Sequence, residues 1–519
     1  MPCLVVLRGI KMEIKIIKTA ARFAVAEIVG CKEERLAAEL NGKAVELNNT
    51  INYIDGLKPE TEYILEANGV KAAFKTEYEF VTLDVRNFGA KGDGENDDTV
   101  YIQAAVMACP EKSRVLVSKG KYKVTNLFLK SNITIEISED AEIIADNERF
   151  SHAIFPGMIK SYDENDEYNL GTWEGNPLKM FAGIITGVDA ENVTICGKGL
   201  LNGNASHEDW WYNEKVMVGA FRPRMLFFER CKGVEVYGIK IQNSPSWTVH
   251  PYFSEDIRIC AVKINNPQNS PNTDGIDVES CKNVLIEGVR FTLGDDCIAL
   301  KSGKIYMGRK YRVSSENIRI RRCFMENGHG AVTLGSEMSA GIKNVKVEDC
   351  IFRNTDRGLR IKTRRGRGDT AVIDEITFRN IIMDNVKTPF VANCFYFCDP
   401  DGRTSFVQDR NPHPVDEGTP YIKKLCFENI ECKGCNFAAA YFIGLPERKI
   451  SEIVMKNVAV DYAENAEKGF PAMLCGIEEM SRRGIIAENI EKITLENVRI
   501  NGQEGDALEF INVDNVEER

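Results

Sequence analysis

The most regular feature of the chain is a tetrad whose second and fourth residues are apolar and whose third is mostly polar. An alternation with a period of two places the apolar side chains on one face of a β-strand. Each tetrad is therefore expected to be a strand with one face in a core. Ten tetrads follow the pattern, at Asn192–Ile195, Gly233–Val236, Asp256–Ile259, Asn283–Ile286, Asn317–Ile320, Asn344–Val347, Glu375–Phe378, Lys424–Phe427, Glu452–Met455 and Lys492–Leu495.

The distances between the tetrads predict how the strands are arranged. Most tetrads follow one another by roughly one turn of a parallel β-solenoid with loops of varying length, and several precede a second apolar strand, such as Val289–Phe291. A leucine-rich repeat would need a tighter period with leucine dominant. At 519 residues the chain exceeds one ordinary compact core, a limit that does not apply to solenoids. We expect an all-β fold, with a right-handed parallel β-helix over residues 79–519.

The first part of the chain has a different pattern and predicts a separate unit. Residues 13–78 contain short alternating runs, Phe23–Val29 and Lys43–Leu47, with turn residues between them. The stretch Ile54–Leu65 resembles the Leu-x-Pro-x-Thr-x-Tyr corner of fibronectin type III domains. We expect a small β-sandwich here, and we interpret residues 1–12 as an N-terminal extension.

Two features are expected to close the solenoid. Residues near Asp98 to Met107 predict a short helix, capped by Asp or Thr, that covers the first coil. Long inserts near residues 145–180 and 203–222 must fold over one face. They carry Tyr168, Trp173, Trp210, Trp211 and Tyr212, which predict either the walls of a pocket or the cores of the loops themselves.

Four strands bring reactive groups to nearly the same place. The strands Gly275–Val278, Cys297–Leu300, Ala331–Leu334 and Gly358–Ile361 lie on successive coils, and each is followed by Glu, Lys, Gly or Lys and then Ser or Thr. Neighbouring coils stack about 4.8 Å apart, so residues far apart in sequence become neighbours. The groups that we expect to form one patch are Asp274, Asp295, Asp296, His329, Arg360 and Lys362.

Charge and composition narrow the class of function. The net charge of −11 argues against a nucleic-acid-binding surface, and no apolar run is long enough to span a membrane. Arg364, Arg365 and Arg367 extend the local basic cluster and fit either a solvated loop or a site. With no export signal apparent, we interpret the sixteen cysteines as free thiols in a cytoplasmic protein. We expect no metal and no cofactor, and the Cys432–Cys435 pair is discounted as a zinc site because no second pair matches it.

The patch as a whole carries a family resemblance. Asn272-Thr273-Asp274, Gly294-Asp295-Asp296, Gly328-His329-Gly330 and Arg360-Ile361-Lys362 resemble, in order, the four motifs of glycoside hydrolase family 28, the polygalacturonases. Further stretches, Ser244–Pro251 and Gly335–Ser339, are similar to bacterial exo-acting members.

The resemblance implies a role for each site residue. Asp295 is implied as the general acid, Asp274 and Asp296 as the groups that activate water, and His329 as the group that keeps the acid protonated and oriented. Crowding the carboxylates should raise at least one pKa, and inversion at the anomeric carbon would place the carboxyl groups roughly 6.5 to 9.5 Å apart. Arg360 and Lys362 are implied to bind the sugar carboxylate. Asn272 shapes the turn, and Trp247 and His250 either contact the substrate or pack in the core.

The expected function is hydrolysis of α-1,4 bonds in oligogalacturonates or pectin fragments, from a chain end and with inversion. Endo-polygalacturonase and rhamnogalacturonan hydrolase are the rivals within the enzyme class. Pectate lyase would eliminate rather than hydrolyse and would rely on calcium. A non-catalytic β-helix that binds carbohydrate explains the repeats but not the carboxylates. The sequence leaves the oligomeric state and the role of the N-terminal unit open.

Overall fold

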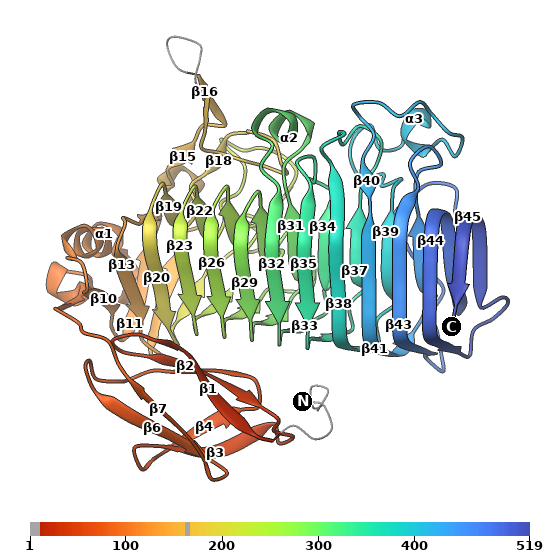
Figure 1. Ribbon diagram of the computed structural model, residues 1–519. Helices are drawn as coiled ribbons and strands as arrows, with labels where there is room; N and C mark the ends of the chain where they lie inside the picture. Colours follow the sequence, from red (N-terminus) through yellow and green to blue (C-terminus); the bar gives the residue numbers. More distant parts are fainter. Residues whose placement is uncertain (1–10, 161–166) are drawn as a thin grey trace.

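A computed structural model describes residues 11–160 and 167–519. In this part the chain forms a right-handed parallel β-helix with a small β-sheet domain beneath it (Figure 1). The all-β class that the tetrads predict is confirmed. Most of the expected extension over residues 1–12 lies outside the described residues, which begin at Lys11.

Each full coil contributes strands to three faces, and all ten tetrads lie on the first. Their apolar residues point into one continuous core. Towards the C-terminus the strands lengthen and bend from one face onto the next, and the last two strands begin on the third face beside β42 (Ala438–Ile443). The first face contains β8 (Thr82–Asp84), β10 (Arg114–Val117), β13 (Ile133–Ile137), β20 (Glu191–Gly197), β23 (Lys232–Tyr237), β26 (Glu255–Cys260), β29 (Lys282–Glu287), β32 (Ser315–Arg321), β35 (Ile342–Glu348), β38 (Val372–Asp384), β40 (Tyr421–Ile422), β41 (Lys424–Cys435), β43 (Ile450–Tyr462), β44 (Arg483–Asn501) and β45 (Leu508–Glu518).

The other two faces complete the coil. The second contains β9 (Asp93–Asp97), β11 (Gly120–Val124), β14 (Ala141–Ala145), β21 (Leu200–Asn202), β24 (Lys240–Gln242), β27 (Lys263–Asn265), β30 (Arg290–Thr292), β33 (Phe324–Glu326) and β36 (Ile351–Arg353). The third contains β12 (Leu127–Phe128), β19 (Ile185–Val188), β22 (Leu226–Glu229), β25 (Val249–Tyr252), β28 (Ile276–Glu279), β31 (Ile298–Lys301), β34 (Val332–Gly335), β37 (Arg357–Lys362), β39 (Thr388–Asn393) and β42 (Ala438–Ile443).

Asparagines at the start of the first-face strands explain how the coils stay in register. Asn283, Asn317 and Asn344 adopt φ values of 57°, 57° and 51°. Asn tolerates this left-handed region better than most residues. The side-chain amide of Asn317 donates to Asn283 at 3.2 Å, and that of Asn344 donates to Asn317 at 2.8 Å. Each coil is thus fixed to the preceding one at the same point.

A short helix covers the first coil, as the sequence predicts. Helix α1 (Thr99–Ala108) follows η1 (Val85–Phe88) and buries Ile102 and Val106 in the core. Asp97, rather than Asp98, accepts a hydrogen bond from the first helical N–H, that of Thr99, at 2.9 Å. The helix end of the solenoid is therefore closed by apolar packing.

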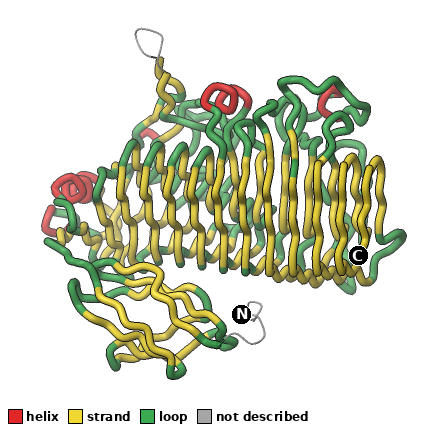
Figure 2. The backbone as a smooth tube through the Cα atoms, in the orientation of Figure 1, coloured by secondary structure: helices red, strands yellow, loops and turns green. Residues whose placement is uncertain are grey.

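Loops cover the third face, where Figure 2 shows them along one side of the β-helix. None of the helices in residues 11–160 and 167–519 combines the length and apolar character needed to cross a membrane. The short elements in these loops are η2 (Arg149–Ser151), β15 (Ile154–Phe155), β16 (Met158–Lys160), β17 (Glu167–Asn169), β18 (Met180–Phe181), α2 (Ile305–Tyr311) and α3 (Ser405–Gln408).

The N-terminal unit consists of two antiparallel sheets packed face to face around their own core. The Tyr63 hydroxyl accepts a hydrogen bond from the backbone N–H of Lys58 at 2.9 Å, the bond of a tyrosine corner. The fibronectin type III label itself stays a prediction. One sheet has the order β1 (Glu13–Thr19), β2 (Ala24–Val29), β5 (Ile51–Ile54), and the other β4 (Lys43–Asn48), β3 (Arg35–Leu40), β6 (Glu62–Ala67), β7 (Val70–Lys75).

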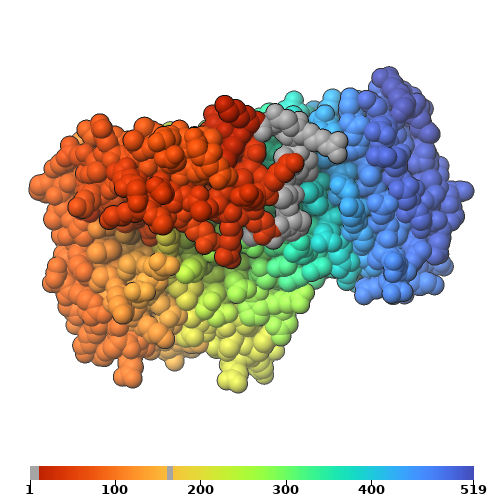
Figure 3. Space-filling model, turned by 90° about the horizontal axis from the view of Figure 1, so that it is seen from below, coloured from red at the N-terminus to blue at the C-terminus, as the bar shows by residue number. Residues whose placement is uncertain are grey.

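This small domain is docked on the β-helix and lies across the underside of its first half (Figure 3). Phe23 and Ile51 form a buried apolar cluster with Tyr237 of the solenoid. An ion pair joins Glu27 to Arg322 at 3.0 Å. Apolar burial and a largely buried ion pair thus hold the domain in place.

The cysteines in the described residues, fifteen of the sixteen, are all free. Cys196 and Cys260 are buried in strands, and Cys323 and Cys350 are buried just before β33 and β36; these thiols act as small apolar side chains.

Candidate active site

The predicted site residues lie on the outer side of the third face. Asp274 and Asp296 precede β28 and β31, His329 precedes β34, and Arg360 and Lys362 lie on β37. These strands are consecutive neighbours in the sheet. The structure therefore brings together the patch that the sequence predicts.

The three aspartates form a tight cluster. One oxygen of each of Asp274, Asp295 and Asp296 lies within 4.8 Å of the others. Asp274 and Asp296 are buried, whereas Asp295 is partly exposed. The expected separation of roughly 6.5 to 9.5 Å refers to whole carboxyl groups rather than to nearest oxygens, and it stays a prediction.

Asp296 is held as a carboxylate by two cations. Arg360 donates to one of its oxygens at 3.0 Å and Lys362 to the other at 3.0 Å. Burial works to raise the pKa of Asp296, but Lys362 and Arg360 outweigh it and hold the pKa well below its usual range. Both cations are therefore paired within the protein, and their binding of a sugar carboxylate stays a prediction. They also neutralise charge that would otherwise attract a metal ion to the cluster.

Asp274 is the carboxyl group that favours protonation. Burial raises its pKa well above the usual range, and the nearby charge of Asp295 adds to the effect. The prediction that crowding raises at least one pKa is thus confirmed. The rise falls on Asp274, which motif position pairs with Asp296 as an activator of water.

His329 lies beside the cluster and pairs with Asp356, a residue that sequence reasoning did not identify. Its Nδ1 lies 2.8 Å from a carboxylate oxygen of Asp356, and its side chain is 53% exposed. The bond to Asp356 raises the pKa of His329, and the charge of Asp295 acts in the same direction. Asp356 lies one coil after His329. Its place just before β37 was the only feature of the sequence that pointed to a role at the site.

Asn272 shapes the turn before Asp274, as expected. It adopts a φ of 54°, and its side-chain oxygen accepts a hydrogen bond from Arg222 at 2.7 Å. Arg222 also donates to the backbone oxygens of Pro245 and Pro271, at 2.8 and 2.9 Å. Burial lowers the pKa of this guanidinium to about 10. Arg222 lies at the end of an aromatic insert, and sequence reasoning did not identify it.

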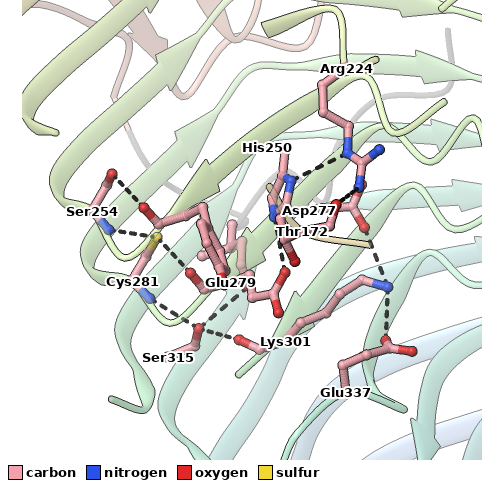
Figure 4. A network of polar contacts seen from close by, with 12 residues as sticks. Thr172, Arg224, His250, Ser254, Asp277, Glu279, Cys281, Lys301, Ser315 and Glu337 are labelled. Atoms are coloured by element: carbon pink, nitrogen blue, oxygen red, sulfur yellow. Dashed lines mark hydrogen bonds and ion pairs between the residues drawn. The ribbon is translucent and has the colours of Figure 1, made fainter. Parts of the chain in front are cut away.

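A buried polar network lies on the neighbouring strands β25, β28 and β31, and Figure 4 shows His250, Glu279 and Lys301 within it. His250 has no exposed surface, so the prediction that it contacts the substrate is wrong for this conformation. Arg224 donates to its Nδ1 at 3.4 Å, and its Nε2 lies 3.0 Å from Glu279. Burial lowers the pKa of His250, which is therefore a neutral ring that donates to Glu279. Trp247 is 4% exposed and belongs to the core of this network.

Lys301 is the central cation of the network. Its ammonium lies 3.1 Å from Glu337, 3.5 Å from Asp277 and 4.0 Å from the centre of the Trp247 ring. Burial works to raise the pKa of Glu337, but Lys301 outweighs it and holds the pKa well below the usual range. Lys301 and Glu279 are register partners on neighbouring strands. Each directly follows one of the four strands predicted from the sequence, so this position in the sequence indicated the network.

The extended basic cluster is structural. Arg364, Arg365 and Arg367 are all at most 4% exposed, so the solvated-loop alternative is wrong. Arg365 forms two hydrogen bonds to Glu447, at 2.6 and 2.8 Å, and Arg364 and Arg367 both contact Asp399. These ion pairs fix the loops that cover the C-terminal side of the site.

The aromatic inserts mostly form their own cores. Trp210 is fully buried with Phe181, and Trp173 stacks on Phe221 with ring centres 4.7 Å apart. Tyr168 and Tyr212 keep 38% and 65% of their surface exposed. The loop-core alternative therefore holds for the tryptophans.

Known proteins share this arrangement. Residues 111–472 match the family described as glycosyl hydrolases family 28, and residues 82–137 match the family described as rhamnogalacturonase A/epimerase, pectate lyase-like. The chain is 30% identical over 392 residues to a probable polygalacturonase of Vitis vinifera, covering 74% of each protein. It is 26% identical to an exo-poly-alpha-D-galacturonosidase of Dickeya chrysanthemi, over 69% of this chain and 66% of that one.

A solved structure agrees with these matches. The hyperthermoactive exopolygalacturonase from Thermotoga maritima superposes with a TM-score of 0.66 and 25% identity, over 82% of this chain and 92% of that one. The family match covers more than half of the chain and includes all four motifs. This protein belongs to family 28 of the glycosyl hydrolases.

Proposed function

We propose that this protein hydrolyses α-1,4 bonds between galacturonate residues and acts on chain ends. The observation that carries the proposal is the cluster of three aspartates beside two cations. Glycoside hydrolysis needs one protonated carboxyl group and one carboxylate, and the cluster supplies both kinds. The names of the relatives from Vitis vinifera and Dickeya chrysanthemi support galacturonan as the substrate.

In the proposed mechanism Asp296 is the base. Arg360 and Lys362 keep it ionised, so it can accept a proton from water as the water oxygen attacks the anomeric carbon. Asp295 donates the proton that the leaving oxygen needs, because it is the partly exposed member of the cluster, whereas Asp274 is buried. The glycosidic C–O bond breaks as the leaving oxygen takes up this proton.

His329 positions the acid. Its raised pKa favours an imidazolium, which stabilises the neighbouring carboxylate once the proton has left. Asp356 holds the ring by its Nδ1, leaving Nε2 to face the site. His329 is thus proposed as a group that re-establishes the protonation state between turnovers.

Arg360 and Lys362 serve two roles in this proposal. They neutralise Asp296, and they attract the carboxylate of the sugar bound next to it, because two cations around one carboxylate leave net positive charge. Arg360 is 7% and Lys362 is 9% exposed, so only a group that enters the cleft directly can reach them. A neutral hexose would lack this attraction.

We propose inversion of configuration on the strength of the family resemblance. A retaining enzyme, in which the two carboxyl groups lie about 5 to 5.5 Å apart, would form the opposite anomer first. The anomeric form of the first product distinguishes the two outcomes.

We propose exo action because the names of the Dickeya and Thermotoga relatives describe exo-acting enzymes and because loops cover both sides of the site. Chromatography of a galacturonate hexamer digest tests the proposal. Early release of monomer with a pentamer agrees with it, whereas an early mixture of dimers to tetramers indicates an endo-enzyme. Turnover of rhamnogalacturonan alone, or an unsaturated product that absorbs in the ultraviolet, would identify a rhamnogalacturonan hydrolase or a lyase.

We also propose a reducing, intracellular location. The fifteen described cysteines are free, and eleven of them are buried. Cell fractionation with an antibody to the chain tests this point, and recovery in the culture medium would contradict it.

A further inference from the structure

A groove separates the N-terminal domain from the second face of the β-helix. Its volume is about 670 Å³. Lys240, Lys263 and Arg290 line its floor, and Tyr53 lies in the wall that the small domain provides. We call this feature the basic groove. It lies on a different face from the aspartate cluster, so it is separate from the candidate active site.

Two glycines of the solenoid allow the domain to approach this closely. A Cβ atom on Gly238 would lie 2.5 Å from the Tyr53 ring, and one on Gly288 would lie 2.5 Å from the side chain of Ile51. Both glycines have positive φ values, 74° and 64°. An ion pair of 2.6 Å between Lys198 and Asp55 closes the junction beside them. The groove is therefore a defined product of docking.

The cations on the floor form a row. Lys240 is the register partner of Lys263, and Lys263 is the register partner of Arg290. One cation per coil gives a spacing of about 4.8 Å. Like charges directly opposite one another destabilise a sheet, so a row of this kind works against the fold unless something offsets it.

The two lysines of the row lack acidic partners. Within residues 11–160 and 167–519, neither Lys240 nor Lys263 forms an ion pair. Burial lowers the pKa of Lys263, and the charges of Lys240 and Arg290 lower it further, while Glu139 opposes them only weakly. An anion in the groove would relieve this repulsion.

A second cavity at the same junction provides the contrast. It has a volume of about 350 Å³ and lies on the other side of the docked domain. Most of its cations are paired, among them Lys18 with Glu235 at 2.7 Å and Arg22 with Glu79 at 2.7 Å. Glu34, Glu46 and Glu139 also line the basic groove, and Lys198 there pairs with Asp55, but among the described residues none of these carboxylates forms an ion pair with Lys240 or Lys263.

The groups around the row suit a saccharide. Two residues after each cation, on the same face of the strand, stand Gln242, Asn265 and Thr292, which can hydrogen bond to hydroxyls. The Tyr53 ring is partly exposed in the opposite wall. Aromatic rings with nearby polar groups are typical of ligand sites. Cations spaced along a line with amides beside them match a chain of repeated carboxylates and hydroxyls.

We propose that the basic groove binds a stretch of polygalacturonate outside the active site. Lys240 and Lys263 each meet a carboxylate, the polar side chains beside them meet ring hydroxyls, and Tyr53 packs against one sugar face. The choice of galacturonate as the ligand rests on the proposed function. The groove would hold a long chain on the enzyme between successive cuts.

Calorimetric titration with a galacturonate octamer tests the proposal. The titration uses Asp295→Asn, so that the ligand is not hydrolysed. Two classes of site per chain are expected. Adding Lys240→Glu and Lys263→Glu should weaken the groove class by about 100-fold, since two charge-assisted contacts become repulsive. A fully methyl-esterified octamer, which carries no carboxylates, should not bind the groove.

Lys346→Glu is the matched control. Lys346 is an exposed lysine on β35 of the first face, and its reversal should leave both classes of site intact. Thermal melting of the Lys240→Glu and Lys263→Glu variant checks folding, and its KM for long polygalacturonate should rise by about tenfold relative to its KM for the trimer.

Three results would overturn the proposal. They are a single class of sites in Asp295→Asn, two classes that survive the double reversal, and equal binding of polyglutamate in the groove. Failure of the proposed function would look different, because the wild-type enzyme would then leave the galacturonate trimer uncut whatever the groove binds.

Discussion

Two faces of the same coils differ in how deeply they bury their ion pairs. On the first face, Lys282 and Glu316 pair at 3.2 Å with side chains that are 46% and 19% exposed. On the third, Lys301 and Glu337 pair at 3.1 Å with side chains that are 5% and 8% exposed. The backbone register is the same kind of parallel ladder in both places. Loops over the third face therefore turn ordinary ion pairs into a buried network that can shift pKa values and support catalysis.

The largest difference is expected at the aspartate cluster itself. Asp295→Asn should lower kcat by about 10³-fold, because a general acid contributes on the order of 10² to 10⁴ to the rate. Oligogalacturonate binding should remain. Asp256→Asn, the same change on the first face, should leave kcat within about twofold of wild type. Retained turnover in Asp295→Asn would end the proposed role of this residue as the acid.

Replacing Lys301, the central cation of the buried network, should lower the free energy of unfolding more than the matching change on the exposed first face. Lys301→Met leaves Glu337 and Asp277 buried without their ammonium, and breaking such a buried pair costs about 3 to 5 kcal/mol of unfolding free energy. Lys282→Met on the exposed face should cost less than about 1 kcal/mol. Urea unfolding measures both. Equal losses in the two variants would mean that burial of the network has no energetic consequence.

Lys362→Ala should weaken substrate binding and should also impair the role of Asp296 as the base. KM should rise by about tenfold, because one cation for the sugar carboxylate is lost. Lys362 is also the strongest of the groups that lower the pKa of Asp296, so in the variant that pKa rises and the acidic limb of the kcat/KM profile moves to higher pH. Lys346→Ala on the first face should change neither quantity. An unchanged KM together with an unmoved acidic limb would contradict the assignment.

Asp356→Asn should shift the opposite limb of the pH profile. The bond from Asp356 raises the pKa of His329, so its loss lowers that pKa and deprotonates the ring at a lower pH. The alkaline limb of kcat/KM should move down by about one pH unit. Asp374→Asn, a change on the first face, should leave the limb in place. A profile for Asp356→Asn that superposes on wild type would remove His329 from the protonation cycle.

The smallest expected effect is on stability as pH rises. Burial raises the pKa of Glu229 in the folded chain to about 8, above its unfolded value of about 4.3. The folded state thus binds the extra proton, so its stability is full below the unfolded pKa and is lost as pH rises through about 8. Glu229→Gln should make the fall in Tm between these values smaller by at least about 2 °C. The same dependence of Tm on pH in the wild type and in Glu229→Gln would contradict the conclusion that Glu229 is buried and protonated.

The first face is the part that the sequence predicts best. Its strands repeat one alternation, and residues such as Asn283 and Asn317 do the same task on every coil. The site was predictable as far as its strands and its aspartates, because each motif lies at the same place on a coil. The partners could not be predicted. Asp356 reaches His329, and Arg222 reaches Asn272, through loop geometry that has no period.

The expectations that differ from the structure concern residues whose surroundings are formed by loops. Sequence reasoning did not identify the pairing of Arg360 and Lys362 with Asp296, because the position of Asp296 between them depends on how the turns before β31 and β37 fold. His250 seemed able to face the substrate by its motif. The loop that carries Thr172 and the strand start at Arg224 cover it instead, and Arg224 bridges the two.

Proton NMR of a galacturonate hexamer digest tests the central claim most directly. The account predicts a galacturonate monomer and a pentamer as the first products, formed by wild type and absent with Asp295→Asn. The new reducing end should appear first as the β-anomer, as inversion of an α-linkage requires. No cleavage of the hexamer by wild type, or equal cleavage by Asp295→Asn, would contradict the claim that the aspartate cluster hydrolyses galacturonan.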